Sequence, residues 1–204
     1  MQNKIILDLK SVFSKHNFTE TTLTLTPLYV FENRSLDELG HPISVTEFSS
    51  LEPSKRHFKI LNPIENNAVS HICIDGHFIP FGQQKYDINS HSINDGRPDC
   101  VVFDDNTFLF VELKLEQLDI SFDKEKSKWK RFFEGLNQIE DFVKFWRSNG
   151  FEIKDYYPQV YAIVCMRFEP VFRRTSARNT EILKRSQKLK FKIIIQNYFE
   201  FDKI

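Results

Sequence analysis

The spacing of hydrophobic residues changes several times along the chain, and each change predicts a different element. Residues 3–16 have apolar side chains at positions 5, 6, 9, 12 and 13, which is the spacing of one helix face. Residues 21–31 alternate as a half-buried strand does, and Pro27 indicates an edge or an end of that strand. Residues 32–57 are polar and irregular, so no element is predicted there.

Later in the chain, short apolar runs between Asn- and Gly-bearing turns predict strands at 57–63, 68–76 and 77–82. The second half then alternates strands and helices. Its predicted elements are strands 99–104 and 107–115, a helix over about 123–148 that stops before Gly150, a strand at 159–165, a helix at 175–189 and a strand at 190–196.

This order of elements predicts an α/β fold with a mixed central sheet flanked by helices on both faces. The 204 residues suit a single domain over 1–204, with a core from about residue 57 to residue 204 and an N-terminal extension over 1–56. Phenylalanine occurs 21 times, which favours a bulky core over an aromatic binding strip.

The hydrophobic run at 96–116 carries charged residues, which are costly in a buried sheet unless something compensates them. A hairpin with either a two-residue or a four-residue loop places Asp99 directly opposite Glu112. The alternation of strand side chains puts Lys114 on the same face, with Arg97 opposite it. The apolar residues divide between two faces: Val101, Phe103, Phe108 and Phe110 on the charged face, and Cys100, Val102, Leu109, Val111 and Leu113 on the other.

Two facing carboxylates repel each other, and three arrangements could relieve the repulsion. One acid could bind a proton, Lys114 and Arg97 could neutralise the pair, or a divalent cation could bridge the oxygens. The geometry alone leaves a salt-bridged sheet end and a metal site as equal alternatives.

The motif "RPD" at 97–99, followed after twelve residues by "ELK" at 112–114, resembles the PD-(D/E)XK nuclease superfamily. The resemblance covers about residues 96–165 and implies a restriction-endonuclease-like core. It implies that Asp99 and Glu112 bind Mg²⁺, with Mn²⁺ as an alternative, that the backbone carbonyl of Leu113 joins the coordination, and that Lys114 is the catalytic lysine.

Two further residues would belong to such a site. Many members carry a glutamine on the helix after the motif, and Gln138 is the candidate here, with a solvent-exposed glutamine as the alternative interpretation. Many members also have an acid on an early helix, and Glu65 is the favoured choice. The other acids considered are Glu20, Glu38, Glu47 and Glu52.

The chemistry of phosphodiester cleavage fits these residue types. A carboxylate-held Mg²⁺ can bind a phosphate oxygen and lower the pKa of bound water, and a lysine adds compact positive charge near the transition state. The histidines have no metal-ligand spacing, and neither a phosphate-binding Gly-rich loop nor a GxSxG motif is present.

The net charge is zero, with 28 basic and 28 acidic residues, which argues against binding by a strongly basic chain as a whole. Two segments are nevertheless basic and could form one positive face. They contain Lys124, Lys126, Lys128, Lys130 and Arg131, and Arg167, Arg173, Arg174, Arg178, Lys184, Arg185, Lys188, Lys190 and Lys192.

We therefore predict a Mg²⁺-dependent nuclease that binds nucleic acid, DNA more than RNA, with a homodimer or a protein partner left open. The alternative is a catalytically inactive nuclease-fold protein that acts as a nucleic-acid-binding or protein-interaction module. Cys73, Cys100 and Cys165 lie far apart in apolar runs, which predicts buried reduced thiols of a cytoplasmic protein. No apolar run approaches the roughly 20 residues of a membrane span.

Overall fold

The computed structural model describes most of the chain between residues 20 and 201. The described ranges are 20–24, 27–36, 42–62, 67–74, 96, 98–115, 124–166 and 176–201. The helix predicted at 3–16 and the strand predicted at 77–82 lie outside them.

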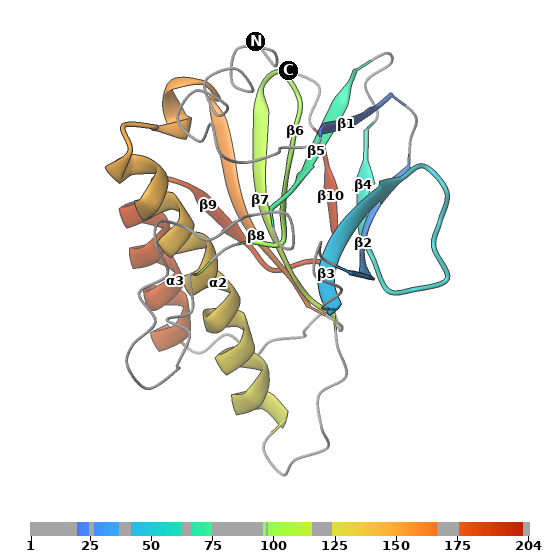
Figure 1. Cartoon of the computed structure of the whole chain (residues 1–204). Coiled ribbons are helices and arrows are strands. Elements are labelled where there is room, and N and C mark those ends of the chain that lie inside the picture. Colours follow the sequence, from blue (N-terminus) through green and yellow to red (C-terminus); the bar gives the residue numbers. More distant parts are fainter. Residues whose placement is uncertain are drawn as a thin grey trace.

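The described residues form ten strands, two α-helices and a short 3₁₀ helix (Figure 1). The strands are β1 (Glu20–Leu23), β2 (Leu28–Leu36), β3 (Pro42–Ser49), β4 (Phe58–Leu61), β5 (Val69–Cys73), β6 (Cys100–Phe103), β7 (Thr107–Lys114), β8 (Gln159–Met166), β9 (Lys192–Ile194) and β10 (Tyr198–Glu200). The helices are α2 (Lys124–Ser148), η1 (Ile153–Asp155) and α3 (Ser176–Leu189). Among the described helices, none combines the length and the apolar composition needed to cross a membrane.

The strands form two sheets. The larger sheet has six strands in the order β1-β5-β6-β7-β8-β9, antiparallel from β1 to β7 and parallel from β7 to β9. The smaller sheet has four strands in the order β10-β4-β2-β3, with β10 parallel to β4. The chain is therefore an α/β protein with mixed sheets, as predicted.

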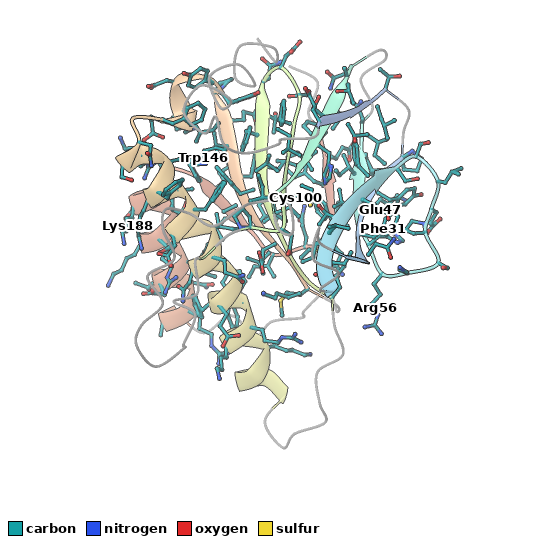
Figure 2. All side chains as sticks on the ribbon, viewed as in Figure 1. Phe31, Glu47, Arg56, Cys100, Trp146 and Lys188 are labelled. Atoms are coloured by element: carbon teal, nitrogen blue, oxygen red, sulfur yellow. The ribbon has the colours of Figure 1, made fainter. Side chains whose placement is uncertain are left out.

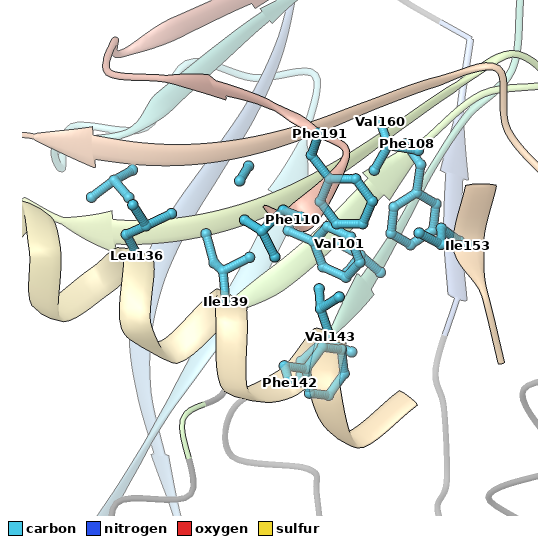
Figure 3. Close-up of a cluster of buried hydrophobic side chains, with 14 of the residues drawn as sticks. Val101, Phe108, Phe110, Leu136, Ile139, Phe142, Val143, Ile153, Val160 and Phe191 are labelled. Carbon is cyan, nitrogen blue, oxygen red and sulfur yellow. The ribbon is translucent and has the colours of Figure 1, made fainter. Parts of the chain in front are cut away.

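A different layer covers each face of the six-stranded sheet. Helices α2 and α3 lie on one face (Figure 1), where Phe110, Phe142 and Val143 belong to a continuous buried core (Figure 3). The four-stranded sheet lies on the other face, and its Leu28 and Ile60 belong to a second core with residues of β6, β7 and β8. In Figure 2, Trp146 lies on the helical side of the molecule, and Phe31 and Glu47 lie on the side of the second sheet.

The prediction of helices on both faces is wrong for the described helices, because strands take the place of helices on one side. Strand β4 shows why strands cover this face: Phe58 and Ile60 are buried, whereas Lys59 between them is partly exposed. A strand with one apolar face has to bury that face against another layer, and here the six-stranded sheet supplies that layer.

The described part of the N-terminal extension belongs to both sheets. The strand predicted at 21–31 is two strands, β1 in the larger sheet and β2 in the smaller, with Pro27 between them. Strand β3 lies where no element was predicted, and β10 follows the last predicted strand. The strands and helices predicted for the second half of the chain occur within a few residues of their expected bounds.

Both helices end in the same hydrogen-bonded turn, but with different residues at its strained position. At the end of α2, Phe151 N donates to Trp146 O at 2.9 Å, and Gly150 has φ of 80°. At the end of α3, Phe191 N donates to Ser186 O at 3.2 Å, and Lys190 has φ of 64°. Glycine is the usual residue in this left-handed position, so the predicted stop at Gly150 is confirmed and the lysine is an exception.

Candidate metal and phosphate site

The β6–β7 hairpin brings two carboxylates to the same end of the sheet. Its pairs run from Phe103 opposite Phe108 to Cys100 opposite Val111, which is the predicted register and places Asp99 opposite Glu112. Asp99 Oδ2 accepts the backbone N–H of Leu113 at 2.5 Å, so its carboxylate reaches across the hairpin. Asp99 also extends the pairing with β5, because its carbonyl accepts from Ile74 N at 2.9 Å.

Both acids are buried, and Lys114 lies beside them as predicted. Asp99 is 7% exposed and Glu112 is 1% exposed. Lys114 Nζ lies 2.5 Å from Glu112 Oε1 and donates a hydrogen bond of 2.8 Å to Gln138 Oε1. Gln138 of α2 is therefore at the site and is not a solvent-exposed surface residue. Arg97, the predicted partner of this cluster, lies outside the described residues.

The electrostatics keep Lys114 charged. Burial alone would lower the pKa of Lys114, but the charge and hydrogen bond of Glu112, followed by the charge of Asp99, raise it above its ordinary value. Arg131 acts in the opposite direction, which places further positive charge within range of Lys114. The site thus combines two carboxylates with a persistent ammonium group at one sheet end.

Helix α2 approaches the hairpin closely because two glycines leave room for it. A Cβ atom at Gly135 would lie 2.9 Å from Glu112 Cγ and 3.1 Å from Val164 Cγ1, so the helix backbone rests directly on the acid. A Cβ atom at Gly96 would lie 2.8 Å from Gln138 Cα. Sequence reasoning missed both residues. For Gly135 a signal was present, because a glycine inside a helical pattern can indicate close packing.

The donor set suits Mg²⁺, which binds one or two carboxylates together with water and phosphate oxygens. Asp99 and Glu112 supply hard oxygen donors from rigid strands, and the Leu113 carbonyl remains a predicted third donor. Within the described ranges, His, Cys, Asp and Glu side chains form no metal-binding group of three or more. The group present is thus a pair of acids with a lysine.

The early acids that are described make contacts elsewhere. Glu20 Oε1 accepts from Ser70 Oγ at 2.6 Å, and Glu47 Oε1 accepts from Asn33. Glu52 lies 3.8 Å from His57. Glu65 and Glu38 lie outside the described residues, so a third acidic ligand remains a prediction.

Basic and aromatic side chains gather where α3 lies along α2. The guanidinium of Arg178 lies over the ring of Trp129 at 4.7 Å, on the face of the sheet that carries Glu112. Arg185 lies over Phe133 at 5.0 Å and also contacts Glu140 and Glu181. Arg173 and Arg174 lie outside the described residues, so their position relative to Glu112 stays a prediction.

The three cysteines are buried and free, as predicted. Burial, and then the charge of Asp99, raise the pKa of the Cys100 thiol well above its ordinary value. The same two causes raise the pKa of Cys165. A thiol with a raised pKa is a poor nucleophile, so Cys100 and Cys165 are not candidates for nucleophilic catalysis.

Comparison of the chain with family models, with curated proteins and with solved structures gave no match. The functional interpretation therefore depends on the geometry of the site and on its motif.

Proposed function

We propose that this protein is a Mg²⁺-dependent nuclease of the PD-(D/E)XK type, with a restriction-endonuclease-like core, that cleaves phosphodiester bonds in DNA. The observation that carries the proposal is the buried cluster of Asp99, Glu112 and Lys114 at one end of the hairpin. A buried acid in this position suits a functional group better than a stabilising one, because burial of charge is costly even when the charge is paired.

Each side chain has a role in this proposal. Asp99 and Glu112 would hold the cation, and Leu113 would add its backbone carbonyl. The bound Mg²⁺ would supply positive charge at the phosphate and a more acidic water. Lys114 stabilises negative charge that develops on the phosphate, and Gln138 holds the ammonium group in position through its 2.8 Å hydrogen bond.

The proposal of a nucleic-acid substrate is supported by the basic residues along α2 and α3. Arg131 lies within electrostatic range of Lys114, and Arg178 lies on the same side of the sheet as Glu112. Such residues can contact a phosphate backbone that enters the site from the helical layer. The buried free thiols support the proposal of a cytoplasmic protein, since a reducing compartment keeps cysteines unpaired.

The test is a cleavage assay on supercoiled plasmid and on labelled oligonucleotides of DNA and RNA, with Mg²⁺, with Mn²⁺ and with chelator. Wild type is expected to cleave DNA in the presence of metal, and Lys114→Ala is expected to lose at least about 100-fold in rate, as when a transition-state donor is removed. Lys55→Ala, at an exposed lysine in the connection between β3 and β4, is the matched control and should cleave as wild type does.

A second variant separates catalysis from folding. Lys114→Ala leaves Glu112 buried without its cation, which can cost about 3–5 kcal/mol of stability. The double variant Glu112→Gln with Lys114→Met removes both charges, so it should fold and still fail to cleave. If Lys114→Ala cleaves at the wild-type rate, the proposed catalytic role is wrong. If wild type binds DNA in a salt-dependent way but never cleaves it, the inactive nucleic-acid-binding module is the better description.

A further inference from the structure

A second charged feature lies at the opposite end of the six-stranded sheet. A cavity of about 300 Å³ opens between the start of β8, the strand β9 and the end of α3. The β7–β8 register pairs Thr107 with Gln159, beside this cavity, and Lys114 with Met166, beside the acids. At about 3.3 Å per residue, Gln159 and the residue opposite Glu112 are roughly 16 Å apart along β8.

The lining of this cavity is basic. It includes Lys154, Lys190 and Lys192, and it includes no acidic residue. Lys154 Nζ donates to the carbonyl of Pro158 at 3.0 Å, and Lys192 Nζ lies 5.3 Å from the centroid of the Tyr161 ring. Within the described part of the chain, none of the three lysines forms an ion pair with a carboxylate.

The lysine charges of this cavity are therefore available to an anion from solution, because no carboxylate of the described chain pairs with them. Like charges that surround one concave space create a positive potential, which attracts a counter-ion and is strengthened by low-dielectric walls. Phe191 is buried at this cavity and supplies part of such a wall. Gln187 and Gln159 add amide groups that can donate hydrogen bonds.

The backbone at Lys190 gives an independent reason to assign a role to this cavity. Lys190 occupies the left-handed position that Gly150 occupies at the end of α2, within the same type of turn. A side chain in this conformation is strained, and glycine would remove the strain. Backbone strain of this kind clusters at binding and catalytic sites, which motivates a functional role for this cavity.

We propose that this cavity binds a small phosphate-bearing anion. Its volume is at the lower end of the range for ligand sites, which suits a diphosphate or the phosphate end of a nucleotide. Lysine ammonium groups are compact charges that bind phosphate well, and the Tyr161 ring supplies an apolar surface beside them. The inference is independent of the proposed nuclease activity, because the cavity shares no residue with the Asp99 cluster.

The test is isothermal titration calorimetry at low ionic strength with three probes: pyrophosphate, adenosine monophosphate and a short oligonucleotide with or without a 5′-phosphate. Wild type is expected to bind pyrophosphate, more weakly as salt is added. Lys192→Gln should weaken binding by about tenfold or more, since a hydrogen bond to a charged group is worth at least that factor. Competition by the 5′-phosphorylated strand alone would identify a strand end as the source of the phosphate, and competition by the nucleotide alone would identify a free ligand.

Lys190→Gly gives the sharpest variant, because it should raise the melting temperature while weakening pyrophosphate binding by about tenfold. Lys184→Gln, an exposed lysine of α3 outside the cavity, should bind as wild type does. Asp99→Asn should also bind pyrophosphate normally, which separates this site from the nuclease proposal. Absence of pyrophosphate, nucleotide and phosphorylated-strand binding in wild type would overturn the inference, as would unchanged binding in Lys190→Gly and Lys192→Gln.

Discussion

Among single residues, Asp99 and Glu112 carry like charges that the fold balances in different ways. Asp99 accepts a backbone N–H from Leu113, and Glu112 contacts the ammonium group of Lys114. A neutral amide oxygen can still accept the backbone N–H, although more weakly than a carboxylate does. A part-buried ammonium group that loses its carboxylate partner keeps an uncompensated charge. Loss of the Asp99 charge should therefore be tolerated better than loss of the Glu112 charge.

We predict that Asp99→Asn keeps or raises the melting temperature in the absence of metal. The Asn oxygen can still accept from Leu113 N, and the repulsion from Glu112 is removed. The variant should lose most of the stabilisation that Mg²⁺ or Mn²⁺ gives wild type, because a cation that binds only the folded state stabilises it by mass action. Thermal melts with and without millimolar metal measure both effects.

Asp105→Asn is the control for this prediction, since Asp105 is exposed at the hairpin turn. It should keep the metal-dependent rise in melting temperature. A large drop in the melting temperature of Asp99→Asn, together with wild type that metal never stabilises, would identify the acids as salt-bridge partners of a structural sheet end.

Among the elements, α2 limits the space beside Glu112, because the helix backbone at Gly135 packs directly against that side chain. We predict that Gly135→Ala lowers stability by about 1–3 kcal/mol, since the new methyl group would overpack against Glu112 and Val164. It should also weaken the metal-dependent stabilisation and slow cleavage. Chemical denaturation and the metal melts measure the two effects separately.

Gly150→Ala distinguishes general instability from damage to the site. This variant should have a free energy of unfolding lower by roughly 1 kcal/mol, because alanine is strained at the left-handed position, and it should leave metal binding unchanged. The prediction about Gly135 fails if Gly135→Ala stabilises the protein by about 1 kcal/mol, which is the gain expected in an unobstructed helix.

The same elements show what the sequence could predict. The hairpin register followed from a tight turn and the alternation of strand side chains, so Asp99, Glu112 and Lys114 could be placed together. The helix after the hairpin followed from its apolar spacing and from Gly150. These signals depend on neighbouring residues in the chain, so they can be recognised in a single sequence.

The parts that could not be predicted depend on distant contacts. Strand β3 lies within the segment 32–57, which is polar and irregular as a whole, and its strand form depends on pairing with β2. The close packing of α2 on Glu112 could not be predicted, because it depends on where α2 crosses the hairpin. The position of Gly135 in the sequence does not give that crossing point. The second sheet likewise depends on pairing between segments far apart in the chain.

For the whole molecule, the junction of the two sheets includes a buried histidine. His71 of β5 is 3% exposed, lies 3.0 Å from Thr46 Oγ1 of β3 through Nε2, and stacks on Phe48 at 5.3 Å. Burial lowers its pKa from 6.5 to about 3. The folded protein therefore keeps His71 neutral in a range where the unfolded chain protonates it.

We predict that His71 makes the protein less stable as the pH falls from 6.5 towards 3. In that window the unfolded state binds the extra proton, so the free energy of unfolding decreases by up to about 1.4 kcal/mol per pH unit from this residue. His71→Phe removes this titratable group, so the free energy of unfolding should fall less steeply with decreasing pH, by up to the same amount per pH unit. Denaturant melts at a series of pH values measure the slopes.

Thr46→Val should keep the wild-type slope, because it removes the hydrogen bond of His71 but not the burial that shifts the pKa. Equal slopes for wild type and His71→Phe would show that His71 becomes protonated in the folded protein over the same range.

The parallel pairing of β10 with β4 has a consequence for the order in which the molecule assembles. Tyr198 lies beside Lys59, although more than half the chain separates them, whereas β6 and β7 meet through a short turn. Close neighbours meet early and distant ones late, because closing a long loop is entropically costly. During synthesis on the ribosome, the part of this apolar core that Phe199 covers beside Ile60 stays exposed until β10 emerges. The nascent chain therefore exposes an aggregation-prone apolar surface for most of its translation, and a chaperone that binds this surface would protect the chain during that period.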